Sequence, residues 1–336
     1  MPRPGAVRRV TSSDVAKEVG LSRTTVGYVL NDVPHQKIPE ATRKRVIEAA
    51  ARLGYTPSAA ARSLRSGRSD VVLCLLPDIP IGYTINALLA SLAGALESNG
   101  LTLVVHPRAR STRPISDVWK AITPAAALTL EEISAREAAA MRAAGIELTS
   151  VIWGGGAEQR RAVLTISDER IGRVQAQHLA ARGHRRLGYA LPVDPRVEMF
   201  SDPRLDGVRL SCADLGLDAP MVERVAVDPD SAVAAIRRWR DAPEPVTGIC
   251  AYNDEIGIAL INAAQREGLT VPGDLAVIGV DDIPLAGATN PGLTTVVLSP
   301  ELPGIIADNI VAALAGRVSD RQPNSIAVQL IERDSV

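Results

Sequence analysis

Aromatic residues are scarce in this chain, and their scarcity limits how its interior can be built. They make up 3% of 336 residues, whereas the hydrophobic share as a whole is 46%. The interior must therefore be packed by aliphatic side chains and alanine. That share is enough to fill the cores of two or three domains, the number that a chain of this length suggests.

Long apolar runs and a full set of paired cysteines are also missing. No run of eighteen apolar residues occurs, so we expect no membrane-spanning helix and no membrane partner. The basic N-terminus, MPRPGAVRR, is not followed by an apolar stretch, which disfavours a secretory signal. Cys74, Cys212 and Cys250 lie far apart and cannot all pair, which indicates a cytoplasmic protein.

The motifs of common enzyme classes are missing as well. The sequence contains no GxxxxGK[ST] phosphate loop, no GxSxG nucleophile elbow and no HExxH helix. Its four histidines and three cysteines show no spacing typical of metal ligands. We therefore expect no enzymatic activity, no cofactor and no resident metal.

What the sequence does have is a strong separation of charge. Residues 1–68 carry 13 Lys and Arg against 5 Asp and Glu, although the net charge of the whole chain is −1. The remaining residues are therefore acidic on balance. A small basic segment on a larger acidic body is typical of a protein that binds a polyanion with one end. A basic tail without any partner is the alternative.

The basic segment reads as helices alone, the first two separated by a short turn. In VTSSDVAKEVGLSRTTVGYVLN, Thr11 is placed to cap one helix and Ser22 the next. Val26, Val29 and Leu30 share one face of the second helix, which we expect to pack on the first.

The opposite face of that second helix is suited to a DNA groove. Arg23, Thr24, Gly27 and Tyr28 share this face, because positions three and four apart point the same way. Ser22 at the helix start can offer its hydroxyl and nearby N–H groups to a phosphate. The pattern predicts a helix-turn-helix, although any small helical hairpin has two such faces.

Two further segments follow before the composition changes. EATRKRVIEAAARLG is predicted to be a longer helix, with Val46, Ile47, Ala50 and Leu53 as its apolar stripe. YTPSAAARSLRSGRS has room for only about two helical turns, which are marginal alone in water. We expect it to be a linker that becomes helical against a partner.

After Ser69 the pattern alternates between strand and helix. The runs that read as strands are VVLCLLP, LTLVVHP, AAALTL, LTSVIW, AVLTIS, RLGYAL, VERVAV, GICAYN, LAVIGVDD, LTTVVLS and SIAVQLIE. Most are continuously apolar, as expected of parallel strands covered on both faces. This α/β layout fits two adjacent sheets with a cleft at the carboxyl ends of their strands.

Taken together, these segments resemble the lactose-repressor family of transcription regulators over nearly the whole chain. In the N-terminal part the likeness is carried by VTSSDVAKEVGLSRTTVGYVLN and IPEATRKRVIEAAARLGYTPSAAARSLRSGRS. In the body it is carried by GRVQAQHLAARGHRRLGY, RLDGVRLSCADLGL, AYNDEIGIALINAAQREGLTVPGDLAVIGVDDIPLA and PGLTTVVLSP. The resemblance implies an all-α helix-turn-helix head plus an α/β periplasmic-binding-protein-like core of two doubly wound subdomains.

The resemblance also implies domain bounds. These are a DNA-binding domain at 1–57, a hinge helix or linker at 58–68, and an effector-binding and dimerisation core at 69–336. Because the family's chain crosses between the core subdomains three times, the N-subdomain would span about 69–167 and 297–323, and the C-subdomain about 168–296 and 324–336.

For DNA, the resemblance implies three groups of contacts. They are base contacts from Arg23, Thr24 and Tyr28, phosphate contacts from Thr11, Ser22 and Asn31, and a minor-groove wedge at Leu64, flanked by Ala61 and Arg65. Gly27 and Tyr28 stand where many members have Ser and Arg. Tyr28 cannot make the bidentate guanine contact that an arginine makes.

For the effector, the resemblance implies three main contacts in the core cleft. Arg204 in RLDG, Asn253 in AYND and Asp281 in GVDD match the family's polar ligand positions. A surface ion pair is the alternative for Arg204, and turn capping is the alternative for Asn253 and Asp281. Asp78 and Ile79, which follow the first strand, are further candidates.

One departure affects the kind of effector. Asp230 stands where several sugar-binding members place a stacking aromatic residue. Either Phe200 or Trp153 replaces that ring, or the ligand is more polar than a typical pyranose.

The expected function is that of a cytoplasmic, homodimeric transcription regulator, in the first place a repressor. Its partners would be a near-palindromic operator and a small-molecule effector, a sugar or related metabolite; whether the effector releases DNA or promotes binding stays open. One alternative is a solute-binding or sensing protein without a DNA role, which the basic head disfavours. Another is a sugar-modifying enzyme on a doubly wound fold, which the missing catalytic motifs disfavour.

Overall fold

The computed structural model of the chain describes residues 10–30, 36–55, 69–108, 114–131, 133–153, 163–319 and 328–336. The chain divides into two units, Met1–Ser69 and Asp70–Val336. The predicted hinge at 58–68 lies outside the described residues, as do the predicted DNA contacts Asn31, Ala61, Leu64 and Arg65.

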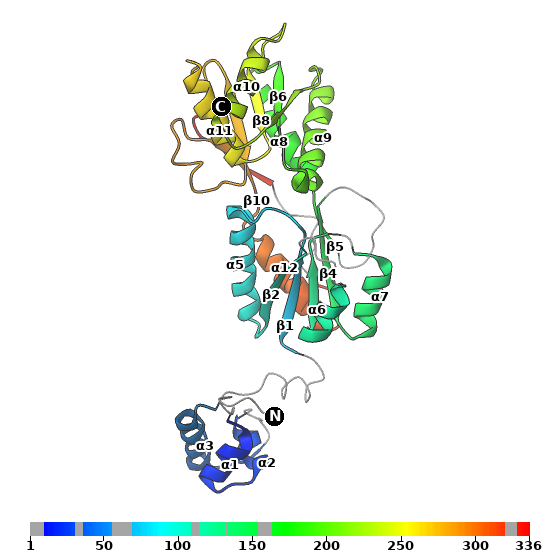
Figure 1. The fold of residues 1–336 in the computed structure, drawn as a ribbon, viewed down its shortest axis with the longest axis vertical. Helices are drawn as coiled ribbons and strands as arrows, with labels where there is room; N and C mark the ends of the chain where they lie inside the picture. The colour runs from blue at the N-terminus through cyan, green and yellow to red at the C-terminus, as the bar shows by residue number, and fades with distance from the viewer. Residues whose placement is uncertain are drawn as a thin grey trace, which may run out of the picture. The chain divides into compact units, whose positions relative to one another are not determined.

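The N-terminal unit contains three described helices (Figure 1). They are α1 (Ser12–Val19), α2 (Arg23–Leu30) and α3 (Glu40–Leu53). Valine and alanine side chains form most of their common core. Val26 and Val29 are buried against α1 residues, which confirms the predicted packing of α2. Ser22 caps α2 as predicted, because its Oγ accepts a hydrogen bond from the Thr25 N–H at 3.0 Å. These contacts fix the direction of the α2 face that points away from the core.

The stripe predicted for α3 is wrong at one position. Ile47 is 52% exposed, whereas Val46, Ala49 and Ala50 are buried. The other two helices cover only the side of α3 on which positions i, i+3 and i+4 lie, and Ile47 is about 100° away from Val46 around the helix.

The first sheet of the core unit has the strand order β2-β1-β3-β4-β5, with all its strand pairs parallel. Its elements are β1 (Val71–Leu76), α5 (Tyr83–Glu97), β2 (Thr102–Pro107), α6 (Ile115–Ile122), β3 (Ala126–Thr129), α7 (Ala135–Ala143), β4 (Glu147–Trp153) and β5 (Val163–Ile166). Val72 and Cys74 pack on the α5 side, whereas Leu73 and Leu75 pack on the side of α6 and α7. Both faces of β1 are therefore buried, which explains its continuous apolar run.

The second sheet has the order β11-β10-β9-β8-β6-β7, and only its β10–β11 pair is antiparallel. Its strands are β6 (Leu187–Pro192), β7 (Met221–Val225), β8 (Gly248–Ala251), β9 (Ala276–Val280), β10 (Thr294–Leu298) and β11 (Val328–Ile331). The other elements are α8 (Asp168–Ala181), the 3₁₀ turn η1 (Pro195–Val197), α9 (Glu198–Asp214), α10 (Pro229–Arg240), α11 (Asp254–Arg266) and α12 (Leu302–Leu314). Helices α8 and α9 cover one face, and α10 and α11 cover the other.

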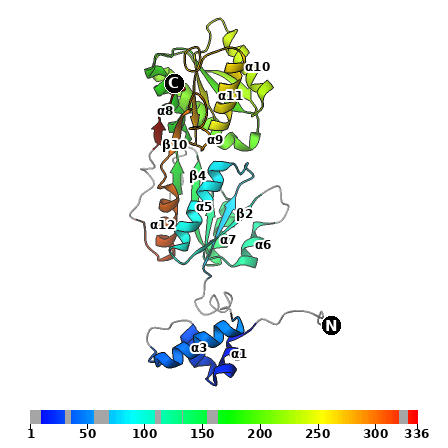
Figure 2. The same ribbon diagram turned by 90° about the vertical axis from the view of Figure 1, so that its left-hand side faces the viewer.

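The two sheets define two lobes that share the chain. After β10 in the second sheet, α12 returns to pack against α5 and β4 of the first sheet (Figure 2). We call the part built on the first sheet, with α5, α6, α7 and α12, the first lobe, and the part built on the second sheet the second lobe. Every predicted strand run overlaps one of the described strands, which confirms the α/β layout. None of the described helices combines the length and apolarity needed to cross a membrane.

Candidate functional site

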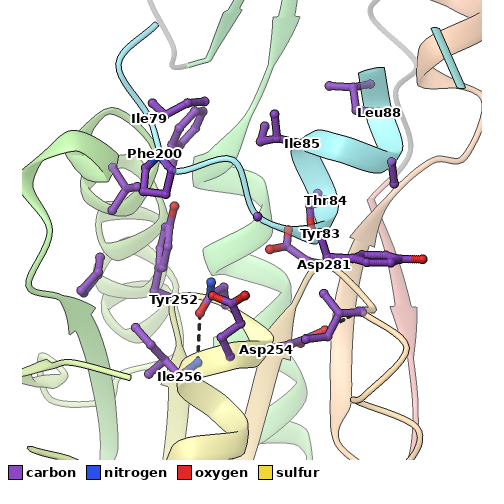
Figure 3. Close-up of a pocket in the computed structure, with 18 of the residues that line it drawn as sticks. Ile79, Tyr83, Thr84, Ile85, Leu88, Phe200, Tyr252, Asp254, Ile256 and Asp281 are labelled. Carbon is purple, nitrogen blue, oxygen red and sulfur yellow. Dashed lines mark hydrogen bonds between the residues drawn. The ribbon is translucent and has the colours of Figure 1, made fainter. Parts of the chain in front are cut away.

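A cavity of about 530 Å³ lies within the core unit, at the carboxyl ends of strands from both sheets (Figure 3). Ile79 follows β1, Asn253 follows β8 and Asp281 follows β9, and all three line it. Open α/β sheets bind ligands at this edge. The volume suits a small organic molecule. Within the described part of the chain, no group of three or more His, Cys, Asp or Glu side chains is arranged to hold a metal ion.

Arg204, on α9, is the fixed polar centre of the cavity. Its Nε donates to Asp168 Oδ1 at 2.7 Å, and its Nη1 donates to the Tyr252 carbonyl at 2.8 Å. The guanidinium also lies over the Tyr252 ring, 4.9 Å from the centroid. Although burial lowers it, the negative charge of Asp168 raises the pKa of Arg204 above its ordinary value. Arg204 is therefore a held cation whose Nη2 is the remaining donor for a ligand.

Two glycines bring α8 and α9 together at this ion pair. A Cβ on Gly172 would lie 1.9 Å from the Arg204 carbonyl oxygen, and one on Gly207 would lie 1.9 Å from the Glu169 carbonyl oxygen. No other residue fits at either position without moving a backbone. This close crossing holds the backbone of Arg204 beside the first turn of α8, where Asp168 lies.

Asp281 occupies an unusual backbone position at the end of β9. Its φ is +110°, and its N–H donates to the Val296 carbonyl at 2.8 Å. Burial raises the pKa of Asp281 to about 6, while the positive charge of Arg204 and a hydrogen bond from Thr84 act in the opposite direction. The turn therefore holds a carboxylate at the cavity with a pKa close to the neutral range.

Asp254 and Asn253 stabilise the same end of the cavity. Asp254 accepts hydrogen bonds from the Thr295 hydroxyl at 2.6 Å and from the Ile283 N–H at 2.9 Å, and burial raises its pKa to about 7. Asn253 caps α11, because its Oδ1 accepts from the Ile256 N–H at 3.0 Å. The capping role expected as the alternative for Asn253 is thus real, and its amide NH₂ is the group left for a ligand.

The structure brings together five of the eight effector positions expected from the sequence. Those in the cavity lining are Ile79, Phe200, Arg204, Asn253 and Asp281. Asp78 is not in the lining; its carboxylate lies 3.7 Å from the Arg196 guanidinium. Asp230 is exposed in the first turn of α10, and Val227 lines the cavity before that helix. Trp153 ends β4, but its side chain lies outside the described part of the structure.

Sequence reasoning missed the contribution of α5 and the loop before it. Thr84, Ile85 and Leu88 line the cavity from this helix. The apolar periodicity of Ile85 and Leu88 does not distinguish a helix face toward a cavity from one toward the core. Tyr252 and Glu255 were also missed, although both lie within two residues of Asn253 in the AYNDE segment.

The predicted DNA-reading face of α2 points away from the helical core. Ser22, Arg23 and Thr24 are exposed and Tyr28 is half-buried. A Cβ on Gly27 would meet no atom within 4 Å. The face is therefore open to a partner, and the individual base and phosphate contacts stay predictions.

The predicted phosphate contact at the start of α1 has a defined local geometry. The Thr11 N–H and hydroxyl both donate to the Asp14 carboxylate, at 2.9 and 2.7 Å. A guanidinium N–H of Arg45, on α3, donates to the Val19 carbonyl at 2.9 Å and joins α3 to the end of α1. The bonds of Thr11 fix the start of α1, and the bond of Arg45 fixes α3 against its end.

Models of known protein families match segments in both units of the chain. Residues 11–58 match the model of bacterial regulatory proteins of the lacI family, and residues 176–336 match a periplasmic binding protein-like domain. The catabolite control protein A of Priestia megaterium is 29% identical over 86% of this chain and 87% of its own length.

Solved structures match over nearly the whole length. The Lac repressor dimer bound to operator and the anti-inducer ONPF superposes with a TM-score of 0.80 at 21% identity, covering 98% of this chain and 99% of that one. The transcriptional regulator CelR in its cellobiose complex superposes with a TM-score of 0.63 at 25% identity, covering 98% and 100%. At 21% identity, the similarity to the Lac repressor structure is one of fold alone.

Proposed function

Since the chain belongs to the lacI family of bacterial regulatory proteins, it is a DNA-binding regulator of transcription, and we propose that it is a homodimeric repressor controlled by a small molecule. The DNA partner is a near-palindromic operator, and the effector binds the cavity between the two lobes. The protein acts in the cytoplasm and has no enzymatic activity of its own. The observation that carries the proposal is that one chain joins an open helix-turn-helix face to a ligand-sized cavity.

The head supplies the DNA-binding part of the proposal. Residues 1–68 are strongly basic, which favours contact with phosphates. Arg23 and Thr24 are exposed at the start of α2, where a recognition helix contacts base edges. The Lac repressor dimer in the similar structure is bound to operator, which supports a dimer on a two-fold site here.

The cavity is where a small molecule would act to control operator binding. A ligand that contacts both lobes stabilises one arrangement of them and shifts the population toward it. The first lobe begins directly after residue 69, so a change in its relation to the second lobe can reach the segment that leads to the head. The similar regulator CelR holds cellobiose, which supports a sugar or a related metabolite as the effector.

Selection of bound sequences from random DNA by the full chain tests the DNA-binding part. We expect a near-palindrome to be enriched. Tyr28→Ala should relax the preference at one symmetric pair of positions by about 1–3 kcal/mol, the worth of a direct base contact. Tyr83→Ala, a matched change in the core unit, should leave the preference intact. If no sequence is enriched, the chain is a solute-binding protein without a DNA role.

A further inference from the structure

We propose that the effector is an amphipathic molecule without an anionic group: its hydrogen-bond-donating head binds the second lobe and its apolar body lies against the first. This inference rests on the proposed function, because it concerns the ligand of the same cavity. Four observations carry it: the location of the charged groups, the pairing of the cations, the apolar residues of α5 and the placing of two aromatic rings.

The two walls of the cavity differ completely in charge. All five charged residues of the lining come from the second lobe: Asp194, Arg204, Asp254, Glu255 and Asp281. The first lobe lines the cavity with uncharged residues only. They lie in the loop that follows β1, in α5 and at the start of α12. A ligand that fills this space therefore meets ionic groups on one side only.

The charge of the second-lobe wall is negative, because its cation is already neutralised. Arg204 is paired with Asp168, which is fully buried. Asp194 is likewise paired, at 2.6 Å, with Arg196. Asp281 shares the positive charge of Arg204 with Asp168, and Glu255 forms no ion pair within the described part of the chain. An anionic ligand would face these carboxylates without a compensating charge, which is costly in a partly dehydrated site.

The same wall favours a head that donates hydrogen bonds. Asp281 can accept them, and the N–H groups of Arg204 Nη2 and Asn253 Nδ2 can donate to a hydroxyl oxygen. Hydroxyl groups, which both donate and accept, satisfy all three; an ammonium group satisfies Asp281 and Glu255. Both kinds of head donate hydrogen bonds to the carboxylates, and the probes below distinguish a hydroxyl head from an ammonium head.

The first-lobe wall favours an apolar body. Ile79, Ile85, Leu88 and Leu302 present aliphatic side chains to the cavity, and the hydroxyl group of Thr84 in the same wall is bonded to Asp281. Figure 3 shows Ile79 beside the Phe200 ring, and Ile85 and Leu88 on the opposite side of the space. Polar groups placed here would lose water without gaining an ionic partner.

Two aromatic rings of the second lobe add apolar surface to the cavity. Phe200, the single phenylalanine of the chain, and Tyr252 both line the cavity and are nearly buried. They stand next to each other in Figure 3. In a chain with so few aromatic residues, this placing gives a ring-shaped or alkyl body a flat contact surface.

Calorimetric titration of the full chain with four probes tests the proposal. Phenyl β-D-glucopyranoside has a hydroxyl head with an apolar body, and 2-phenylethylamine has an ammonium head with a similar body. D-glucose has the head alone, and D-glucose 6-phosphate adds an anion. At least one phenyl probe should bind about tenfold or more tighter than both glucose and its phosphate, because it also buries a ring.

Variants of each wall, with matched controls, locate the contacts. Ile85→Thr should weaken the phenyl probes several-fold, whereas Ile81→Thr, which changes an exposed isoleucine outside the lining, should not. Asp281→Asn should weaken the probe that binds, whereas Asp230→Asn should not. A circular dichroism melt of each variant checks that it is folded.

Three results would overturn the proposal. One is glucose or glucose 6-phosphate binding as tightly as the phenyl probes. Another is unchanged affinity of a phenyl probe in folded Ile85→Thr. The third is no binding of either phenyl probe at millimolar concentration. Operator selection is measured without any probe, so these failures are distinct from a failure of the proposed function.

Discussion

The second-lobe wall of the cavity carries all of its charged side chains, whereas the first-lobe wall carries none. On the second lobe, Arg204, Asn253 and Asp281 occupy fixed positions set by caps, turns and a buried ion pair. On the first lobe, Ile85 and Leu88 are ordinary helix residues that face the cavity. In the proposed function, the second wall would therefore orient a ligand by specific bonds, and the first would select it by shape and by its lack of charge.

Breaking the ion pair under the polar wall should give the largest effect. Asp168→Asn leaves Arg204 buried beside a neutral partner, and we expect the free energy of unfolding to fall by about 3–5 kcal/mol. Urea denaturation measures it. Asp206→Asn removes an exposed partner of Arg209 on the same helix and should change little. Equal effects of the two substitutions would show that burial of the Arg204 pair does not matter.

Disturbing the helix crossing under the same wall should have the next largest effect. Gly172→Ala places a Cβ against the Arg204 carbonyl, so we expect a loss of about 1–3 kcal/mol in stability, together with weaker ligand binding. Gly94→Ala, in α5 on the first lobe, meets no atom within 4 Å and should stabilise the fold slightly. Thermal melts of both variants make the comparison. A stable Gly172→Ala variant would contradict the close crossing.

The charge of the polar wall should make ligand affinity depend on pH. The pKa of Asp281 is about 6, so its carboxylate is ionised above that pH and accepts hydrogen bonds from the ligand head. Affinity should be steady at neutral pH and fall roughly tenfold by one pH unit below the pKa. Arg204, Asp168, Glu255 and Asp254 also face this carboxylate.

Titration calorimetry at several pH values measures this dependence, and Asp281→Asn is its control. The substitution should remove the decline between neutral and acidic pH. A decline of the same size in the variant would assign the titration to another group, with Asp254 the next to replace because its pKa is about 7.

The smallest expected effect lies in the head, at Gly27, the one glycine within its described helices. Gly27→Ala adds a Cβ into open space, so the head should gain about 1 kcal/mol in stability. On the groove face the added methyl group should also weaken operator binding. An unchanged affinity, measured by fluorescence anisotropy, would show that α2 does not approach DNA at this position.

The polar groups of the second-lobe wall could be predicted because they lie in short motifs that resemble the family's ligand positions. Asn253 and Asp281 follow β8 and β9, whereas Arg204 lies inside α9. RLDG, AYND and GVDD name Arg204, Asn253 and Asp281 directly. On the first-lobe wall, Ile79 could be named because it follows a strand, but Ile85 and Leu88 could not, because an apolar helix residue that faces a cavity and one that faces the core give the same periodicity. Ile47 was predicted to be buried for the same reason: its place in an apolar stripe does not show whether another helix covers it, and it is exposed.

Asp168 and Asp254 were missed for a different reason. Each lies in the first turn of a helix, where an acidic residue is ordinary and favourable with the helix dipole. Their importance comes from partners distant in sequence, Arg204 for the first and Thr295 for the second. The strand runs, in contrast, were predictable because burial on both faces leaves a continuous apolar signal.

The most direct test of the account is the affinity of the full chain for its selected operator, measured by fluorescence anisotropy while phenyl β-D-glucopyranoside or 2-phenylethylamine, whichever binds, is added. The account predicts that the bound probe changes the operator dissociation constant. It also predicts that Ile85→Thr and Asp281→Asn each require more probe for the same change. An operator affinity that stays constant while the probe saturates the cavity would contradict it.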